Sequence, residues 1–319
     1  MIGILGAGSL GRLWAALLPQ DQVAFLPRPD ADPAPALLSY SFESIQGSQR
    51  SLALPWLQQP DDLSLLLVTT KAGDTLTALQ HWLPKIPESV PIVLFQNGLG
   101  SQQAVADTSP QRPILAASTT EGANRPDPNR LVHAGSGETW VGALTPRARP
   151  ELPGVVAQLA TTGLVVHAED QILVRLWQKL VVNAGINPFT AILDCPNGDI
   201  LANDFFQRHI DPLCREIAGL MAAEGIGDPT AGELRQRIET VARNTARNTS
   251  SMRGDILNRR TTEIDFINGY LVQLGQRLDI PTPVNQLLTD RVKQLSPHKE
   301  SEEFPDGQSP FEDLHPHRG

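Results

Sequence analysis

The chain has 319 residues, of which 40 % are hydrophobic and 19 % are charged, so it can bury a core and is not a wholly disordered protein. Its net charge of −9 and its pI near 5.3 argue against nucleic acid or an anionic membrane surface as the main partner. An anionic small substrate would therefore need a local cluster of hydrogen-bond donors. The length is enough for two domains.

The two cysteines, Cys195 and Cys214, form no CxxC motif, and no histidine cluster has metal-ligand spacing. We therefore expect reduced, structural cysteines and no metal site. The sequence has no signal-peptide pattern, and none of its apolar runs approaches about 18 residues. These features predict a cytoplasmic protein without a transmembrane helix.

The first eighteen residues, MIGILGAGSLGRLWAALL, follow the order strand, glycine turn, helix. The apolar run 2–5 leads into the turn, and an apolar-periodic segment covers 10–18. In dinucleotide-binding proteins the first glycine of GxGxxG permits a tight turn, the second admits the pyrophosphate, and the third allows close helix packing. The pattern predicts a dinucleotide site formed by Gly6, Ala7, Gly8, Ser9, Leu10 and Gly11. The alternative is a glycine turn that serves packing alone.

The residue just after the second strand of such a fold selects the cofactor. A carboxylate there binds the ribose 2′-hydroxyl of NAD, whereas an arginine accommodates the 2′-phosphate of NADP. The second strand is predicted over 22–26, and both Arg28 and Asp30 follow it. We favour Arg28, and with it NADP; the alternative is that both are solvent-facing loop charges.

Three further apolar runs, 65–70, 91–96 and 113–118, are typical of strands buried on both faces of a parallel sheet. They are followed by Lys71, Asn97 and Thr119. Ligands of open α/β sheets bind beyond the carboxyl ends of the strands, so these three residues are candidates to contact the cofactor or the substrate. Asn97-Gly98 could equally be a plain turn.

The end of this half completes a doubly wound sheet. Segments 131–133 and 138–142 suggest an antiparallel hairpin at the sheet edge, followed by a helix over 155–159 and a strand over 164–167. The sequence therefore predicts an α/β, Rossmann-type domain over residues 1–168.

The second half is predicted to be all helical. In segment 171–193, Lys179, Asn183 and Asn187 lie four residues apart and share one helix face. Pro188 follows, and without its N–H the carbonyl of Ala184 would lack a helical donor, so we expect a kink or break there. The alternative for the face is a solvated stripe with a snorkelling lysine.

Four more helices are predicted, over 199–225, 230–248, 262–278 and 284–295. Together these segments define a helical substrate domain over residues 169–296. The tail, 297–319, is rich in proline and charge and is predicted to be disordered.

Several motifs together resemble one family, the ketopantoate reductases (2-dehydropantoate 2-reductases). The resemblance runs in order from residue 1 to about residue 295 and rests on GAGSLG at 6–11, TTKA at 69–72, QNGLG at 96–100, KLVVNAGINPFTA at 179–191, CPNG at 195–198, NTSSM at 248–252 and TEIDFINGY at 262–270. The lysine–asparagine segment with SSM and TEID is more specific than the glycine motif. The resemblance implies a Rossmann domain, a helical domain, and NADPH-dependent reduction of 2-dehydropantoate to (R)-pantoate on the route to pantothenate and coenzyme A.

The resemblance also implies residue roles. Lys179 matches the general-acid lysine of the family. Asn97, Asn183, Asn187, Ser251 and Glu263 match substrate-contacting positions. Gly6 to Gly11, Arg28 and Lys71 match cofactor-side positions, and the prolines around Arg28 leave its alignment open by a residue or two. Glu121 has no role that the family pattern assigns.

These residue types suit the reaction. Hydride delivery to a ketone builds negative charge on the carbonyl oxygen, and Lys179 would supply both a proton and positive potential. Glu263 would accept from a substrate hydroxyl or orient the lysine. Alternatively, Ser251 could be a helix N-cap, and Glu263 could merely favour a helix dipole.

A geometric condition limits these roles. In one straight helix, residues 251 and 263 would lie about 18 Å apart, too far to touch one small substrate. We therefore expect the chain to bend between Met252 and Thr261, with Gly254 or Asn258 as the pivot.

Two other functions remain open at this point. One is a reductase of the same architecture that acts on another 2-oxo acid or an imine. The other is a non-catalytic NADPH-binding protein, against which the joint presence of Lys179, Asn97 and Glu263 argues. The helical domain could host a homodimer interface, but the sequence does not specify one.

Overall fold

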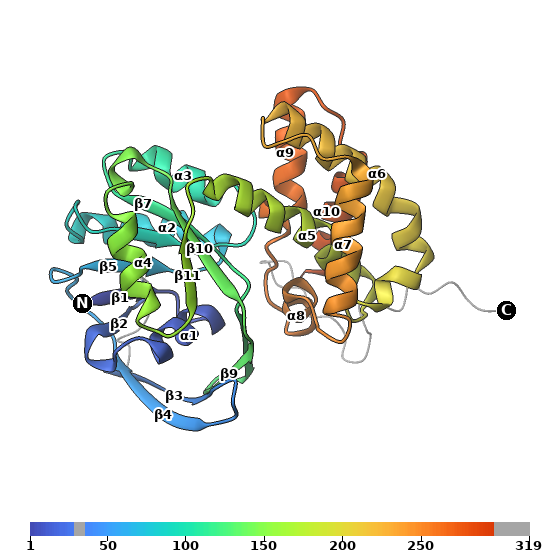
Figure 1. Cartoon of the computed structure of the whole chain (residues 1–319). Helices are drawn as coiled ribbons and strands as arrows, with labels where there is room; N and C mark the ends of the chain where they lie inside the picture. The colour runs from blue at the N-terminus through green and yellow to red at the C-terminus, as the bar shows by residue number, and fades with distance from the viewer. Residues whose placement is uncertain (29–35, 297–319) are drawn as a thin grey trace. The chain divides into compact units, whose positions relative to one another are not determined.

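The computed structural model describes residues 1–28 and 36–296. The chain divides into two compact units, Met1–Leu176 and the part from Trp177 onward (Figure 1). The disorder predicted for 297–319 and the candidate Asp30 lie outside the described residues.

The first unit is an α/β fold. Its strands are β1 Ile2–Leu5, β2 Val23–Leu26, β3 Leu37–Glu43, β4 Gln49–Pro55, β5 Leu65–Val68, β6 Ile92–Leu94, β7 Ile114–Thr119, β8 Gly122–Asp127, β9 Arg130–Gly135, β10 Glu138–Ala143 and β11 Val165–Ala168. Its helices are α1 Ser9–Leu17, α2 Ala72–Trp82, α3 Ser101–Thr108 and α4 Leu152–Ala160, with 3₁₀ turns η1 Gln20–Gln22, η2 Leu83–Lys85 and η3 Pro146–Ala148.

Seven strands form the main sheet in the order β11-β10-β7-β6-β5-β1-β2. The five strands from β7 to β2 are parallel, whereas β10 runs antiparallel to β7. Residues of one strand alternate between two cores because successive side chains point to opposite faces. Leu65 and Leu67 join the core under α1 and α4, while Leu66 and Val68 join the core under α2 and α3. The predicted doubly wound sheet is confirmed.

A second sheet, in the order β4-β3-β9-β8, was not predicted. It packs through Tyr40 and Phe42 of β3 into the core that also holds Leu13 and Trp14 of α1. Its presence makes the predicted hairpin wrong. β9 pairs with β3 and β8 in this sheet, and β10 pairs with β7 and β11 in the main sheet, so the short link between β9 and β10 crosses from one sheet to the other.

The second unit is helical, as predicted. It contains the larger part of α5 Ile172–Leu193, then α6 Asp204–Ala223, α7 Ala231–Asn244, α8 Ser251–Leu257, α9 Asn268–Leu278 and α10 Pro283–Leu295, with 3₁₀ turns η4 Asp199–Ala202 and η5 Ile264–Phe266. Two predicted helices are each divided into a 3₁₀ turn and an α-helix, 199–225 at Asn203 and 262–278 at Ile267. Asn203 divides the first because its side chain caps α6, accepting from the N–H of Phe205. No helix among the described residues is long and apolar enough to span a membrane.

Candidate active site

The glycine turn is fixed by close packing against the end of β5. Gly6 has φ +113°, and a Cβ on it would lie 2.6 Å from the Thr70 nitrogen. A Cβ on Gly11 would lie 2.0 Å from the Gly6 carbonyl oxygen. Thr69 Oγ1 donates to that same oxygen at 2.7 Å. The first and third glycines are therefore required by the fold itself, for the tight turn and for the close approach of α1.

Gly8 differs from both neighbours because its position is open. A Cβ on Gly8 would meet nothing within 4 Å, so packing within the protein does not require a glycine there. Gly8 is the N-cap of α1, where no side chain caps the helix and no acidic residue occupies the first turn. The first N–H groups of α1 form the positive end of the helix dipole, and with the open position at Gly8 this end of the helix fits the diphosphate of a dinucleotide.

Two arginines add positive charge to the turn. Arg12 Nε and Arg125 Nη1 both donate to the Ala7 carbonyl, at 3.0 Å and 3.4 Å. Arg12 is buried and also donates to the Pro128 carbonyl, while its guanidinium lies over the Tyr40 ring. Burial and the neighbouring Arg125 lower the pKa of Arg12. This cluster supplies the local positive field that an anionic ligand needs on a chain of net charge −9.

The other candidates of this unit lie at strand ends, as predicted. Arg28 is exposed and follows β2, Lys71 is the N-cap of α2 after β5, and Asn97 lies in the turn after β6. Thr119 is the last residue of β7, is buried, and accepts hydrogen bonds at Oγ1 from Thr139 Oγ1 and from the N–H of Glu121. The hydroxyl of Thr119 thus helps to hold the end of β7.

Glu121 has a partner that sequence reasoning did not find. Its Oε2 lies 2.7 Å from Nε2 of His133 on β9, and the two side chains are 1 % and 6 % exposed. The residues lie twelve apart in sequence, and only the unpredicted second sheet brings them together. No sequence signal marks this pair.

In the helical unit, Lys179, Asn183 and Asn187 share one face of α5, as predicted. Lys179 and Asn183 are partly buried and Asn187 is 7 % exposed, so this face is not a fully solvated stripe. Of the kink or break expected at Pro188, the break is wrong, because α5 continues to Leu193. A side chain satisfies the carbonyl concerned: Asn268 Nδ2 donates to the Ala184 carbonyl at 3.3 Å, in place of the missing N–H of Pro188.

The ammonium of Lys179 has an unusual proton affinity. Desolvation by burial lowers the pKa of Lys179 to about 8, and the negative charge of Glu263 opposes that shift. Glu263 precedes the 3₁₀ turn η5, and the α-helix that follows, α9, begins only at Asn268. The alternative that Glu263 merely favours the dipole of a helix over 262–278 is therefore not supported, and the charge of Glu263 acts on Lys179.

Ser251 is the first residue of α8 and is exposed. The N-cap is its neighbour Ser250, whose Oγ accepts from the N–H of Arg253 at 3.1 Å, so the alternative of a Ser251 cap is wrong. Ser250 Oγ also lies 2.7 Å from Oγ1 of Thr190 on α5. Thr190 and Ser250, which sequence reasoning missed, thus attach the start of α8 to the helix that carries Asn187.

The predicted bend between Met252 and Thr261 is confirmed. α8 ends at Leu257, Asn258 is its C-cap, and Arg259 has φ +50° in the left-handed region. The N–H of Arg260 donates to the Asp255 carbonyl at 2.8 Å, closing the helix end. Asn258 was one of two predicted pivots; the other, Gly254, lies inside α8 and is not one.

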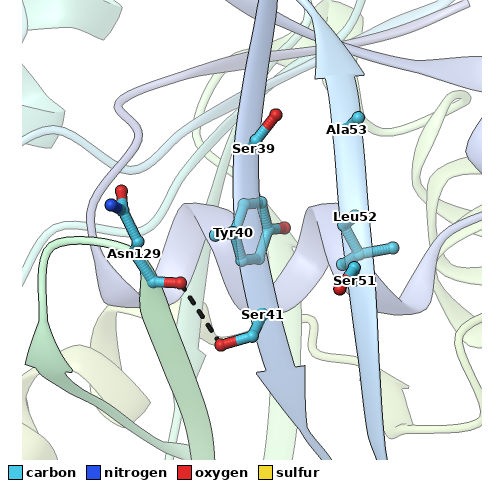
Figure 2. A pocket seen from close by; sticks show the side chains of 7 residues that line it. All are labelled: Ser39, Tyr40, Ser41, Ser51, Leu52, Ala53 and Asn129. Carbon is cyan, nitrogen blue, oxygen red and sulfur yellow. Dashed lines mark hydrogen bonds between the residues drawn. The ribbon is translucent and has the colours of Figure 1, made fainter.

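A surface pocket lies elsewhere in the α/β unit. It has a volume of about 490 Å³ and lies over β3 and β4 (Figure 2). Ser41 on its wall donates to the Asn129 carbonyl at 3.3 Å. None of the predicted site residues lines it. Across residues 1–28 and 36–296, no group of three or more His, Cys, Asp or Glu side chains is placed to hold a metal ion.

A dinucleotide-type glycine turn on an α/β unit, followed by a helical unit with a lysine of lowered pKa, is the combination expected of a nicotinamide-dependent oxidoreductase. Comparison with family models matches residues 2–146 to "Ketopantoate reductase PanE/ApbA" and residues 171–296 to "Ketopantoate reductase PanE/ApbA C terminal". The chain belongs to this family.

Individual relatives agree with this assignment. A Vibrio cholerae protein named 2-dehydropantoate 2-reductase is 37 % identical over 297 residues, which cover 92 % of this chain and 97 % of the relative. A Geobacter metallireducens 2-dehydropantoate 2-reductase structure has a TM-score of 0.78 at 27 % identity, covering 92 % of this chain and 99 % of that one.

The same fold also occurs with another named activity and in a dimer. A ternary structure of D-mandelate dehydrogenase with NADH and anilino(oxo)acetate has a TM-score of 0.81 at 23 % identity, covering 92 % and 98 % of the two chains. A dimeric ketopantoate reductase from Staphylococcus aureus has a TM-score of 0.78 at 16 % identity, covering 92 % and 98 %. At these identities the similarity shows the fold alone.

Proposed function

We propose that this chain reduces 2-dehydropantoate to (R)-pantoate with NADPH, in the formation of pantothenate and coenzyme A. The single observation that carries the proposal is the polar face of α5, which bears Lys179, Asn183 and Asn187. Lys179 has a pKa of about 8 and is paired electrostatically with Glu263, which precedes η5. The V. cholerae relative that is 37 % identical has this named activity, which supports the choice of substrate.

The cofactor-side residues are those of the α/β unit. Gly6 to Gly11 fit the diphosphate, because Gly8 is open and the end of α1 is uncapped. Arg28, Lys71, Asn97 and Thr119 complete the proposed set. Bound NADPH supplies the hydride for the 2-oxo carbon.

The helical unit supplies the remaining chemistry. As hydride adds to the carbonyl carbon, negative charge grows on its oxygen, and the Lys179 Nζ donates the proton that completes the hydroxyl. Asn183 and Asn187 can hydrogen-bond a hydroxylated chain without adding charge. Ser251 and Asn97 are proposed to donate to the substrate carboxylate, and Glu263 to accept from its hydroxyl or to orient the lysine.

The pKa of Lys179 suits a proton donor at neutral pH. With a pKa of about 8, the side chain is mostly protonated at pH 7, yet it releases its proton more readily than an ordinary lysine. The proton and the positive potential therefore come from one group.

A reductase for a different 2-oxo acid or an imine is the main alternative, favoured by the D-mandelate dehydrogenase structure on the same fold. A panel assay of NADPH consumption separates the two. We expect kcat/KM for 2-dehydropantoate to exceed the values for pyruvate, 2-oxo-3-methylbutanoate and phenylglyoxylate by at least about 100-fold. No preference for 2-dehydropantoate would overturn the proposal.

The choice of NADP rests on Arg28. Replacing Arg28 by Ala removes a charge-assisted contact to the 2′-phosphate, which predicts a 10- to 100-fold weaker affinity, roughly, for NADPH. NADH, which lacks that phosphate, serves as the control ligand and its affinity should not change. Equal losses for both cofactors, measured by nicotinamide fluorescence, would contradict the assignment.

The partners follow from the same proposal. We propose a small 2-oxo acid as the ligand, no nucleic acid or membrane partner, and a cytoplasmic location. A homodimer is consistent with the dimeric S. aureus relative.

A further inference from the structure

Pro188 leaves a polar group without its helical donor in the interior of the helical unit. Position 188 would normally donate its N–H to the carbonyl of Ala184, and proline has none. Ala184 is fully buried, so bulk solvent does not reach that carbonyl. An unsatisfied buried carbonyl would cost about 1–3 kcal/mol.

Asn268 satisfies this carbonyl from another segment of the chain. Its Nδ2 donates to the Ala184 carbonyl at 3.3 Å and to Asn285 Oδ1 at 3.1 Å, and both asparagines are 0 % exposed. Asn285 Nδ2 in turn donates to the Glu216 carboxylate at 2.7 Å. This chain fixes the amide orientation, because the reversed amide would place Oδ1 against two acceptors.

The bond joins the two segments that carry the Lys179–Glu263 pair. Ala184 lies five residues after Lys179 on α5, and Asn268 lies five residues after Glu263. The stretch between Glu263 and Asn268 is short and ordered by its own hydrogen bonds: the N–H of Phe266 donates to the Glu263 carbonyl at 3.0 Å. A displacement of Asn268 would therefore be transmitted to Glu263.

We propose that Asn268 is a positioning residue, whose bond to the Ala184 carbonyl holds the Glu263 segment in register with α5 so that Glu263 faces Lys179. The inference deepens the proposed function, since it concerns the group proposed to donate the proton. It differs from a purely structural role, in which Asn268 would only satisfy a buried carbonyl.

The two roles predict different consequences. Loss of register weakens the field of Glu263 at Lys179, and since that field raises the pKa of Lys179, the pKa falls. A purely structural role would lower stability and leave the proton affinity of Lys179 unchanged. Pro188→Ala separates them, because the new N–H of Ala can satisfy the Ala184 carbonyl without tying the Glu263 segment to α5.

The experiment compares the wild type, Asn268→Ala, Pro188→Ala and the double variant. The pH dependence of Lys179 acetylation by acetic anhydride, read by peptide mass spectrometry with the exposed Lys85 as internal reference, reports the proton affinity without requiring turnover. Thermal unfolding reports stability. We expect Asn268→Ala to lower both the Tm and the titration midpoint of Lys179. Asn268→Ala should lower the Tm less in the Pro188→Ala background than in the wild type, because the carbonyl of Ala184 then has another donor. The titration midpoint of Lys179 in the double variant should stay as low as in Asn268→Ala.

The proposal is overturned if the Lys179 midpoint does not move in Asn268→Ala, or if it recovers together with the Tm in the double variant. If Asn268→Ala does not fold, the double variant compared with Pro188→Ala decides alone. A wild type that reduces no 2-oxo acid would refute the proposed function and leave the titration result standing.

Discussion

Lys179 combines positive charge with a lowered pKa, and both properties come from its surroundings. Desolvation makes the ammonium a stronger acid, and Glu263 limits that effect by stabilising the charged form. The balance leaves the group protonated at neutral pH and able to release its proton. The side chain of Glu263 is thus proposed to tune the acid as well as to contact the substrate.

This balance predicts a pH effect with a definite sign. Glu263→Gln removes the negative charge that raises the pKa of Lys179, so that pKa falls below about 8. A general acid must be protonated, and the alkaline limb of kcat should therefore move to lower pH. The measurement is kcat at saturating substrate from about pH 6 to about pH 10.

Asp265→Asn is the matched control for this variant. Asp265 lies two residues from Glu263, but its carboxylate contacts Lys293 at 2.6 Å. Its kcat profile should keep the limb of the wild type. An unmoved or alkaline-shifted limb in Glu263→Gln would contradict the assigned pairing.

Part of the site could be predicted at the residue scale because its signals are local. The i, i+4 spacing placed Lys179, Asn183 and Asn187 on one face, and helix rise alone required the bend that Asn258 makes. Asn268 and Ser250 could not be predicted. Their partners lie 84 and 60 residues away, and only tertiary packing brings each pair together.

At the scale of elements, the glycine turn contains two glycines that the fold requires, Gly6 and Gly11, and one, Gly8, that is proposed to be required by the ligand. Gly11→Ala would place a Cβ 2.0 Å from the Gly6 carbonyl oxygen and 2.5 Å from Thr69 Oγ1. Relief of the first clash requires a shift of the backbone, which costs more free energy than a side-chain rotation. We expect a loss of stability of about 1–3 kcal/mol or more, measured by urea unfolding.

Gly8→Ala is the matched variant, and the expected result is the opposite. Nothing lies within 4 Å of a Cβ there, and the φ of −75° suits alanine, so stability should change little. The methyl group would occupy the space proposed for the diphosphate, and NADPH affinity should fall at least about tenfold. Unchanged NADPH affinity in Gly8→Ala would place the diphosphate elsewhere.

The parallel strands β1, β5 and β7 of the main sheet were predictable because burial on both faces produces continuous apolar runs. The second sheet was not. β4 alternates buried and exposed residues only at its end, and β8 contains Pro126, so neither has a clear strand pattern. The hairpin error arose because adjacency in sequence does not reveal that β9 and β10 pair in different sheets.

For the whole molecule, a net charge of −9 has to be reconciled with the anionic oxo acid proposed as substrate. A chain of net charge −9 repels an anion at long range, so the proposed binding of an oxo acid would depend on local donors, for which Lys179, Asn183 and Asn187 are the candidates. The α/β unit carries the residues that fit a dinucleotide, and the helical unit carries the proposed proton donor. This division of roles predicts that substitutions in the α/β unit can weaken NADPH binding, and that substitutions in the helical unit can abolish turnover without weakening it.

The most direct test is the turnover of Lys179→Ala with 2-dehydropantoate, measured together with its NADPH affinity. If Lys179 is the proton donor, kcat falls by about 100- to 10,000-fold while the dissociation constant of NADPH stays nearly unchanged. A Lys179→Ala enzyme that keeps wild-type turnover would contradict the account.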